Sequence, residues 1–416
     1  MIGVVAVVVA VAIALVFALG SPATPRPTAS PDPSTANAPG APSAPSGPAN
    51  ASATADATAS PRPTVRPVPG HEVFGFVPYW EMTDGIAEHL ARTPLTTLAL
   101  FSVTHTKTGT IDTSQTGYKR ITGPIGKQLI REAHARGTAV QLVYTSFGTA
   151  RNERFLTSTP VQDVTIAALV ALTAKIGADG INVDIERLRA DLIPAYGAFV
   201  GRLRDALHAR LPNAQVSAAT GGGRTGAAMA VAASAANADR IFLMGYDYHY
   251  GGSDVGASAP IDRRDGEDAD LVWSLDLYES LGVPVERTIL GLPLYGMRWR
   301  VSGPEIGASR LGDGAIWVPG DNPKFLAAPP IPPVLDPIEI VEFYAVAPTV
   351  SPVPGDSRAT AGWQAIYVDS PRTLAPKLAL ADDRGLAGAG FWAIGYERGQ
   401  PEYTKLIARF GAGKLR

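Results

Sequence analysis

Cysteine is absent from the 416-residue chain, and histidine is scarce. Without cysteine there are no disulfides, no thiol nucleophile and no cysteine-ligated metal, so an extracellular form would gain its stability from core packing. The six histidines are scattered, and no two have the spacing of a zinc-binding helix such as His-Glu-x-x-His. We therefore expect neither a metal site nor a cofactor.

A surplus of charge is also lacking. Lysine and arginine number 36 against 38 aspartates and glutamates, which gives a formal net charge of −2. A nucleic-acid-binding protein usually carries a basic surplus that neutralises phosphates, so nucleic acid is not an expected partner. Hydrophobic residues make up 46% of the chain, which is enough to bury a large core.

The first 70 residues lack the pattern of a globular domain. Residues 1–20 are almost entirely an uncharged apolar run, and about 18 such residues can cross a bilayer as a helix. Ala18-Leu19-Gly20 has the small-x-small form of a signal-peptide cleavage site, but the run is long and no Lys or Arg precedes it, which favours an uncleaved anchor. Both interpretations predict export. Residues 21–70, rich in Pro, Ala, Ser and Thr, predict a disordered linker.

From His71 to the C-terminus, short β-rich segments alternate with amphipathic helical stretches. The expected strands are 73–80, 97–103, 138–145, 180–186, 215–220, 240–247, 288–294 and 388–394. The expected helices are 125–136, 164–176, 192–211, 268–281, 373–383 and 402–410. Eight strands alternating with helices predict an α/β fold, a closed (β/α)8 TIM barrel over residues 71–416. The competing open doubly wound sheet seldom needs eight strands, and no Gly-x-Gly-x-x-Gly turn follows the first.

Residues 299–362 interrupt this rhythm with a Pro- and Gly-rich stretch after the seventh strand. A long excursion at this point lies on the C-terminal face of a barrel, where active sites form. We expect it to form a wall of the substrate cleft, and the alternative is a disordered surface loop.

The densest polar pattern is Asp179-Gly180-Ile181-Asn182-Val183-Asp184-Ile185-Glu186. Its strict alternation is that of a strand with Asn182, Asp184 and Glu186 on one face. Two acids on one face raise each other's pKa, and a chain that places them in an apolar strand usually uses one as a protonated acid. The alternative is a solvated edge strand.

The other strand ends are rich in aromatic and acidic side chains. The strand-end residues are Tyr79, Trp80, Tyr246, Asp247, Tyr295, Trp299, Trp392 and Tyr396. All of these except Trp80 and Tyr396 are expected to meet a substrate, and core packing is the alternative for each aromatic other than Tyr246 and Trp392. Aromatic faces and carboxylates without metal ligands fit a carbohydrate, because sugar rings offer apolar C–H faces for stacking and hydroxyls for carboxylates to bind.

These residues resemble a known family. Residues 179–186 (DGINVDIE) are similar to the Asp-Gly-x-Asp-x-Asp-x-Glu signature of glycoside hydrolase family 18, the chitinase-like (β/α)8 enzymes. Residues 244–247 (MGYD), 291–296 (GLPLYG) and 390–397 (GFWAIGYE) resemble the ends of the family's sixth, seventh and eighth strands, in the right order. The resemblance spans roughly residues 71–410. It implies the barrel fold and hydrolysis of glycosidic bonds.

The resemblance also implies a substrate-assisted retaining mechanism, an exception to the scheme with two protein carboxylates. Glu186 would be the general acid, and the substrate's own 2-acetamido oxygen would attack the anomeric carbon. Asp184 would hold the acetamido N–H, Tyr246 the acetamido oxygen, and Trp392 would stack beneath the ring. Asp247 would contact the leaving-group side. An ionised Asp184 would keep Glu186 protonated near neutral pH.

Two other motif positions are expected to contribute. Asp179 would sit deeper than the acidic row and orient it, and Met244 would line the substrate site as part of the Met-x-Tyr-Asp motif.

Asn182 replaces the middle aspartate of the family motif, as in bacterial members that resemble spore-cortex and other peptidoglycan glucosaminidases. Because an amide cannot take a proton from Asp184, we expect Asp184 to be persistently ionised and the pH optimum to shift. Residues 145–148 (TSFG) match the family's Ser-x-Gly-Gly only loosely, which leaves the adjacent subsite open.

These observations predict an exported glycosidase, extracellular or at the cell surface, that cleaves β-1,4 bonds at N-acetylglucosamine. The membrane tether and Asn182 favour peptidoglycan over chitin, and another amide-bearing glycan is a further option. The alternative from a different class is a non-catalytic, lectin-like protein on the same barrel, which retention of Glu186 disfavours. The expected partners are the glycan and, through an uncleaved residue 1–20 segment, the membrane, with the protein acting as a monomer.

Overall fold

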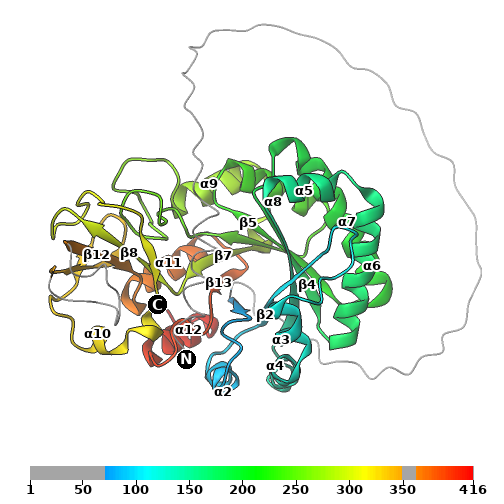
Figure 1. The fold of residues 1–416 in the computed structure, drawn as a ribbon, viewed down its shortest axis with the longest axis horizontal. Helices are drawn as coiled ribbons and strands as arrows, with labels where there is room; N and C mark the ends of the chain where they lie inside the picture. Colours follow the sequence, from blue (N-terminus) through cyan, green and yellow to red (C-terminus); the bar gives the residue numbers. More distant parts are fainter. Residues whose placement is uncertain (1–70, 349–361, 416) are drawn as a thin grey trace, which may run out of the picture. The chain divides into compact units, whose positions relative to one another are not determined.

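The computed structural model describes residues 71–348 and 362–415, so the predicted segments 1–20 and 21–70 lie outside the described residues. Eight parallel strands close into a barrel in the order β1-β13-β7-β6-β5-β4-β3-β2 (Figure 1). They are β1 Glu72–Pro78, β2 Thr97–Thr104, β3 Ala139–Phe147, β4 Gly180–Glu186, β5 Gln215–Gly221, β6 Arg240–Met244, β7 Thr288–Pro293 and β13 Gly388–Trp392. The predicted (β/α)8 barrel is confirmed, and each expected strand is found within a few residues of its predicted bounds.

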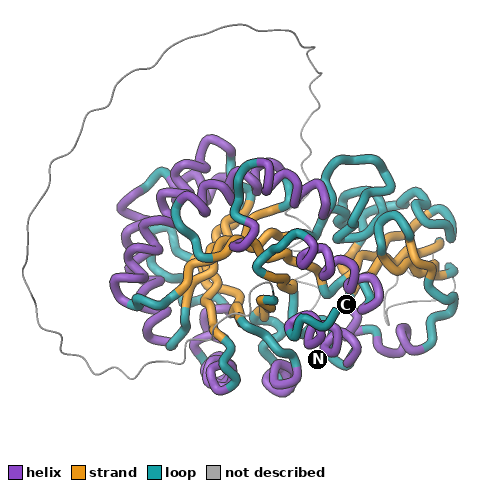
Figure 2. The backbone as a smooth tube through the Cα atoms, turned by 180° about the vertical axis from the view of Figure 1, so that it is seen from behind, coloured by secondary structure: helices purple, strands orange, loops and turns teal. Residues whose placement is uncertain are grey.

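Helices cover the outside of the barrel (Figure 2). They are α2 Ile86–Arg92, α3 Thr116–Thr122, α4 Pro124–Ala135, α5 Thr149–Leu156, α6 Thr159–Ile176, α7 Ile193–Arg210, α8 Arg224–Ala235, α9 Leu271–Ser280, α11 Pro371–Asp383 and α12 Pro401–Gly411. The six predicted helices are all present, while α2, α3, α5 and α8 were not predicted because they are short or, in α8, largely alanine. Helix α6 is apolar and long enough to span a membrane by length and composition, but here it covers the barrel.

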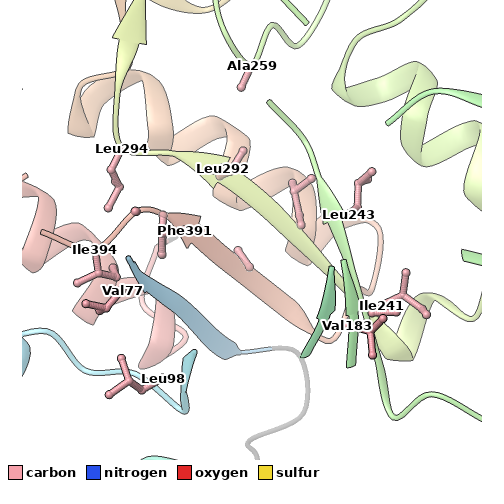
Figure 3. Close-up of a cluster of buried hydrophobic side chains, with 14 of the residues drawn as sticks. Val77, Leu98, Val183, Ile241, Leu243, Ala259, Leu292, Leu294, Phe391 and Ile394 are labelled. Carbon is pink, nitrogen blue, oxygen red and sulfur yellow. The ribbon is translucent and has the colours of Figure 1, made fainter. Parts of the chain in front are cut away.

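Alternation along each strand separates two apolar layers. Outward-facing residues such as Val183, Ile241 and Leu243 pack under the helices as one large cluster (Figure 3). The barrel interior holds a separate cluster around Phe74, Phe76 and Phe242. The Phe242 ring fits because Gly291 and Gly390 face it, and a Cβ on either would lie 2.4 Å from a ring carbon. The lower barrel is therefore a packed core.

The segment after β7 is a folded sheet rather than a loop. Its strands are β8 Gly296–Val301, β9 Ala315–Trp317, β10 Val334–Asp336, β11 Val341–Val346 and β12 Trp363–Val368, in the antiparallel order β10-β11-β12-β8-β9. The sheet begins before and ends after the predicted bounds 299–362, because β8 continues directly from β7 and β12 returns to the barrel.

This inserted sheet contacts two connections at the barrel mouth. Gly314 N–H donates to Gly251 O over 2.7 Å, and Gly320 N–H donates to Tyr396 O over the same distance. Gly251 lies between β6 and α9, and Tyr396 lies between β13 and α12. The insertion therefore supports the loops on which several predicted site residues lie.

Candidate active site

Strand β4 carries the row of polar side chains at the centre of the site. Its odd-numbered residues Ile181 and Val183 belong to the outer apolar cluster, which leaves Asn182, Asp184 and Glu186 facing the barrel interior. Asn182 is 0% exposed and Asp184 is 5% exposed, whereas Glu186, the last residue of the strand, is partly exposed. The row runs from the dry interior to the mouth.

Glu186 is an acid that holds its proton to neutral pH. Burial and, to a smaller extent, the negative charge of Asp247 raise the pKa of Glu186 to about 7, and Arg187 opposes the shift. The charge predicted to raise this pKa was that of Asp184, whereas the neighbouring carboxylate that does so in the structure is Asp247. The backbone of Glu186 is held by Asn152, whose side-chain amide donates to Glu186 O over 2.5 Å.

Asp184 itself favours the neutral form. Burial and the neighbouring Glu186 carboxylate raise the pKa of Asp184 well above its usual value. Among the described residues, Asp184 Oδ1 has no hydrogen-bond partner. A buried carboxylate without donors is costly, so the expectation that Asp184 is persistently ionised is wrong.

Tyr246 and Asp247 follow β6, which ends at Met244 rather than continuing to Asp247 as predicted. Burial and the charges of Asp184, Asp247 and Glu186, in that order, raise the pKa of the Tyr246 phenol, so its hydroxyl keeps its proton and stays a donor. Asp247 has a positive φ of 62°, which turns the chain sharply after the tyrosine.

Tyr295 fixes the Asp247 carboxyl. The Tyr295 hydroxyl donates to Asp247 Oδ1, and Ser258 Oγ lies 3.2 Å from the Tyr295 hydroxyl and accepts from Asp247 N over 3.0 Å. Burial raises the pKa of Asp247, and the hydrogen bonds from Tyr295 and Ser258 oppose that shift. Tyr295 is 3% exposed, so it acts through Asp247 instead of forming the sugar-binding surface that was predicted.

Aromatic rings surround the mouth on the side of β13, β1 and β2. Trp392 meets the Phe101 ring edge-on at 4.7 Å between centroids, and Trp80 lies 6.2 Å from Trp392. Phe147, 40% exposed, lies nearly parallel to Phe101 at 6.4 Å. Trp392 remains partly exposed where it packs on the cluster of interior phenylalanines.

Two further predicted residues lie at the mouth. Tyr79 is partly exposed and meets the Trp80 ring edge-on at 4.9 Å. Met244 is the last residue of β6, where it packs on the interior cluster beside Tyr246. Both positions agree with their placement at strand ends in the sequence.

The predicted role of Asp179 in the acidic row is wrong. Asp179 precedes β4, and its Oδ2 accepts from Val140 N over 2.9 Å and lies 2.6 Å from His134 Nε2. Asp239, which precedes β6, accepts from Val216 N over 2.7 Å in the same way. Both aspartates cap a neighbouring strand at its N-terminal end, opposite the mouth.

Trp299 is also wrongly predicted as a substrate contact. It lies in β8 at 1% exposure, with its ring edge-on to Tyr367 at 6.0 Å and Gly314 close to its indole nitrogen. The side chain belongs to the core of the inserted sheet. The sequence does not point to four polar residues near the site, because they lie on two other strands, a helix and a loop. They are Gln141, Asn152, Ser217 and Ser258.

A family model described as glycosyl hydrolases family 18 matches residues 73–397, most of the chain. The protein belongs to glycoside hydrolase family 18. This membership fits the barrel, the acidic row on β4, Tyr246 after β6 and Trp392 on the last barrel strand.

Individual relatives of this family 18 protein are distant. Nod factor hydrolase protein 1 of Medicago truncatula is 29% identical over 168 residues, which are 39% of this chain and 40% of that protein. The spore cortex-lytic enzyme SleL of Bacillus cereus superposes with a TM-score of 0.63 at 19% identity, over 82% of this chain and 74% of SleL. A chitinase-like agglutinin of Robinia pseudoacacia reaches 0.67 at 17% identity, over 81% and 99%. The two structural likenesses concern the fold alone.

Proposed function

We propose that this family 18 protein is an exported glycosidase that cleaves β-1,4 bonds next to N-acetylglucosamine. The observation that carries the proposal is a protonatable Glu186, with a pKa of about 7, beside buried Asp184 and under an aromatic rim. Residues 1–20 would anchor or export the chain, residues 21–70 would tether it, and residues 71–416 would act as a monomer. A tether that extends from the membrane, together with the amide of Asn182, favours peptidoglycan or its fragments over chitin.

The proposed mechanism uses the substrate's own acetamido group. Glu186 gives its proton to the glycosidic oxygen as the bond to the anomeric carbon breaks, and the acetamido oxygen bonds to that carbon. Tyr246 donates a hydrogen bond to the acetamido oxygen, and Asp184 accepts from the acetamido N–H. Water then attacks the anomeric carbon and returns a proton to Glu186. Trp392 supports the sugar ring throughout.

The substrate test compares two glycans. The purified full-length chain would be incubated with N-acetylglucosamine oligomers and, separately, with purified peptidoglycan, and products would be identified by mass spectrometry. Peptidoglycan fragments ending in N-acetylglucosamine would support the preferred substrate, and cleavage of oligomers alone would replace it with a chitin-type glycan. Binding to both without cleavage would support the lectin-like alternative and overturn the enzyme.

The rate should depend on pH through Glu186. Because the acid must be protonated, kcat/KM should fall as pH rises above about 7, the pKa that burial and Asp247 give to Glu186. Asp247→Asn removes the raising charge while keeping an oxygen for the Tyr295 hydroxyl, so the alkaline limb should move to lower pH. A pH profile of kcat/KM from pH 4 to about 10 measures the shift. An unmoved limb would mean that another group controls the rate.

Phe147 should bind an adjacent sugar. It pairs directly with Glu186 across β3 and β4, and its ring continues the aromatic surface of Phe101 and Trp392 toward solvent. Phe147→Ala should lower kcat/KM for long oligomers about 3- to 10-fold, the worth of one aromatic contact, and affect a short aryl glycoside less. Phe147→Leu keeps an apolar side chain but removes the flat ring, so it distinguishes ring stacking from apolar contact. Leu281 is also an exposed apolar residue, at 47%, and Leu281→Ala should change the kinetics of neither substrate.

A further inference from the structure

A chain of hydrogen bonds descends from Asn182 into the barrel. Asn182 Nδ2 donates to Ser217 Oγ over 2.7 Å, and Ser217 Oγ donates to Gln141 Oε1 over 2.6 Å. Gln141 Nε2 reaches Gln215 Oε1 at 3.4 Å, a weaker contact. Asn182 and Ser217 face each other directly across β4 and β5, and Gln141 enters from β3. Three neighbouring strands therefore determine which way the Asn182 amide points.

The opposite end of the Asn182 amide has no partner of its own. Asn182 Oδ1 and Asp184 Oδ1 are both buried and lack a hydrogen-bond partner among residues 71–348 and 362–415. The two residues are neighbours on the inner face of β4. A buried acceptor without a donor is unfavourable in a dry interior, and a proton on Asp184 would give Asn182 Oδ1 a donor.

We propose that Asp184 is protonated in the resting protein and donates to Asn182 Oδ1, and that Ser217 and Gln141 are positioning residues that hold the amide for this bond. The inference rests on the proposed function, because it concerns the same site. In this arrangement Asn182 does more than replace the aspartate of the family motif, because its side-chain oxygen stabilises the protonated form of Asp184.

The groups around Asp184 favour this state. Glu186 is the next inward-facing residue on β4. A negative charge on Asp184 raises the pKa of two phenols, Tyr246 after β6 and Tyr196 on α7. Each of these groups is acidic or neutral, so none compensates a negative charge at Asp184. Burial acts in the same direction.

The reverse orientation of the amide is the competing arrangement. If Ser217 donated to Asn182 Oδ1, the Asn182 NH2 group would face Asp184 and stabilise its ionised form instead. The Ser217 hydroxyl has one proton, and it donates either to Gln141 or to Asn182. Ser217 is therefore the residue whose removal separates the two arrangements.

Infrared difference spectroscopy detects directly whether the Asp184 carboxyl is protonated, and it needs no substrate. Subtracting the spectrum of Asp184→Asn from that of the full-length parent should isolate the carbonyl band of a protonated Asp184 at neutral pH. Ser217→Ala frees the Asn182 NH2 group to turn toward Asp184, so the band should titrate about one pH unit lower or more. Ser217→Thr keeps a hydroxyl, and Ser274→Ala removes a buried hydroxyl from α9, so both should leave the midpoint unchanged.

The outcomes separate this inference from the proposed function. An active parent without a protonated Asp184 band at neutral pH would overturn the inference and leave the enzyme intact. A parent with the band but no activity on either glycan would overturn the function alone. If Ser217→Ala does not fold, Asn182→Asp provides the second variant. It places a carboxylate beside Asp184 and should raise the midpoint of the Asp184 infrared band, whereas an unmoved midpoint would contradict the pairing.

Discussion

Glu186→Gln should reduce hydrolysis by at least about 1,000-fold, the upper part of the range for losing a general acid. The amide keeps the size and hydrogen-bonding surface of the side chain but carries no proton that it can release to a leaving group. The barrel should remain folded, because Glu186 lies at the open end of β4 and its backbone is held by Asn152. Glycan binding should therefore persist, and the loss should appear in kcat instead of KM.

A matched control is available at the same end of the barrel. Glu81 is also a carboxyl whose pKa is raised by burial, but it pairs with Arg398 over 2.7 Å in the connection after β1. Glu81→Gln should therefore keep most of the activity. If Glu186→Gln retained activity within tenfold of the parent, or if the two variants lost it equally, Glu186 would not be the acid. Initial rates on N-acetylglucosamine oligomers, with binding measured by calorimetry, decide between these results.

Much of this site could be predicted because its residues lie along one strand or at strand ends, where the sequence alone shows which of them share a face. The period of two on β4 puts Asn182, Asp184 and Glu186 on one face, and a parallel barrel brings strand ends together at one mouth. Trp392 and Tyr246 were located by the same reasoning. The same parity also shows why Asp179 does not belong to the row, since it is odd-numbered like Ile181 and precedes the strand.

The remaining features depend on contacts between strands, which a single sequence does not reveal. Nothing around Ser217 in the sequence indicates that it faces Asn182, because the pairing depends on the register of β4 with β5. Asp247 raises the pKa of Glu186 only because the chain turns after β6, at a residue with positive φ. Trp299 follows the seventh barrel strand, and the Pro- and Gly-rich stretch after it gives no clear strand pattern, so the sequence does not indicate the inserted sheet that buries this side chain.

Asp184→Asn should have opposite effects on activity and stability. Activity should fall about 100- to 1,000-fold, as when one preorganised electrostatic group is removed, because the Asp184 carboxyl can give its proton to solvent and become the anion that stabilises a cationic intermediate, whereas an amide cannot. Stability should rise, because the folded state raises the pKa of this buried carboxyl above its unfolded value. Between those two pKa values the folded protein binds more protons than the unfolded one, so the parent loses stability as pH rises.

The gain from Asp184→Asn should therefore be small near pH 4 and grow with pH, by about 1.4 kcal/mol for each unit by which folding raises the pKa. Urea unfolding of both proteins at a series of pH values measures it. Asp313→Asn, which removes an 85% exposed carboxylate paired with Arg310, should give a nearly flat difference. A gain that shrinks with rising pH would mean that the folded protein prefers ionised Asp184. A gain that grows means that the site stores a stability cost in Asp184, and the carboxyl recovers that cost only when positive charge develops on the substrate.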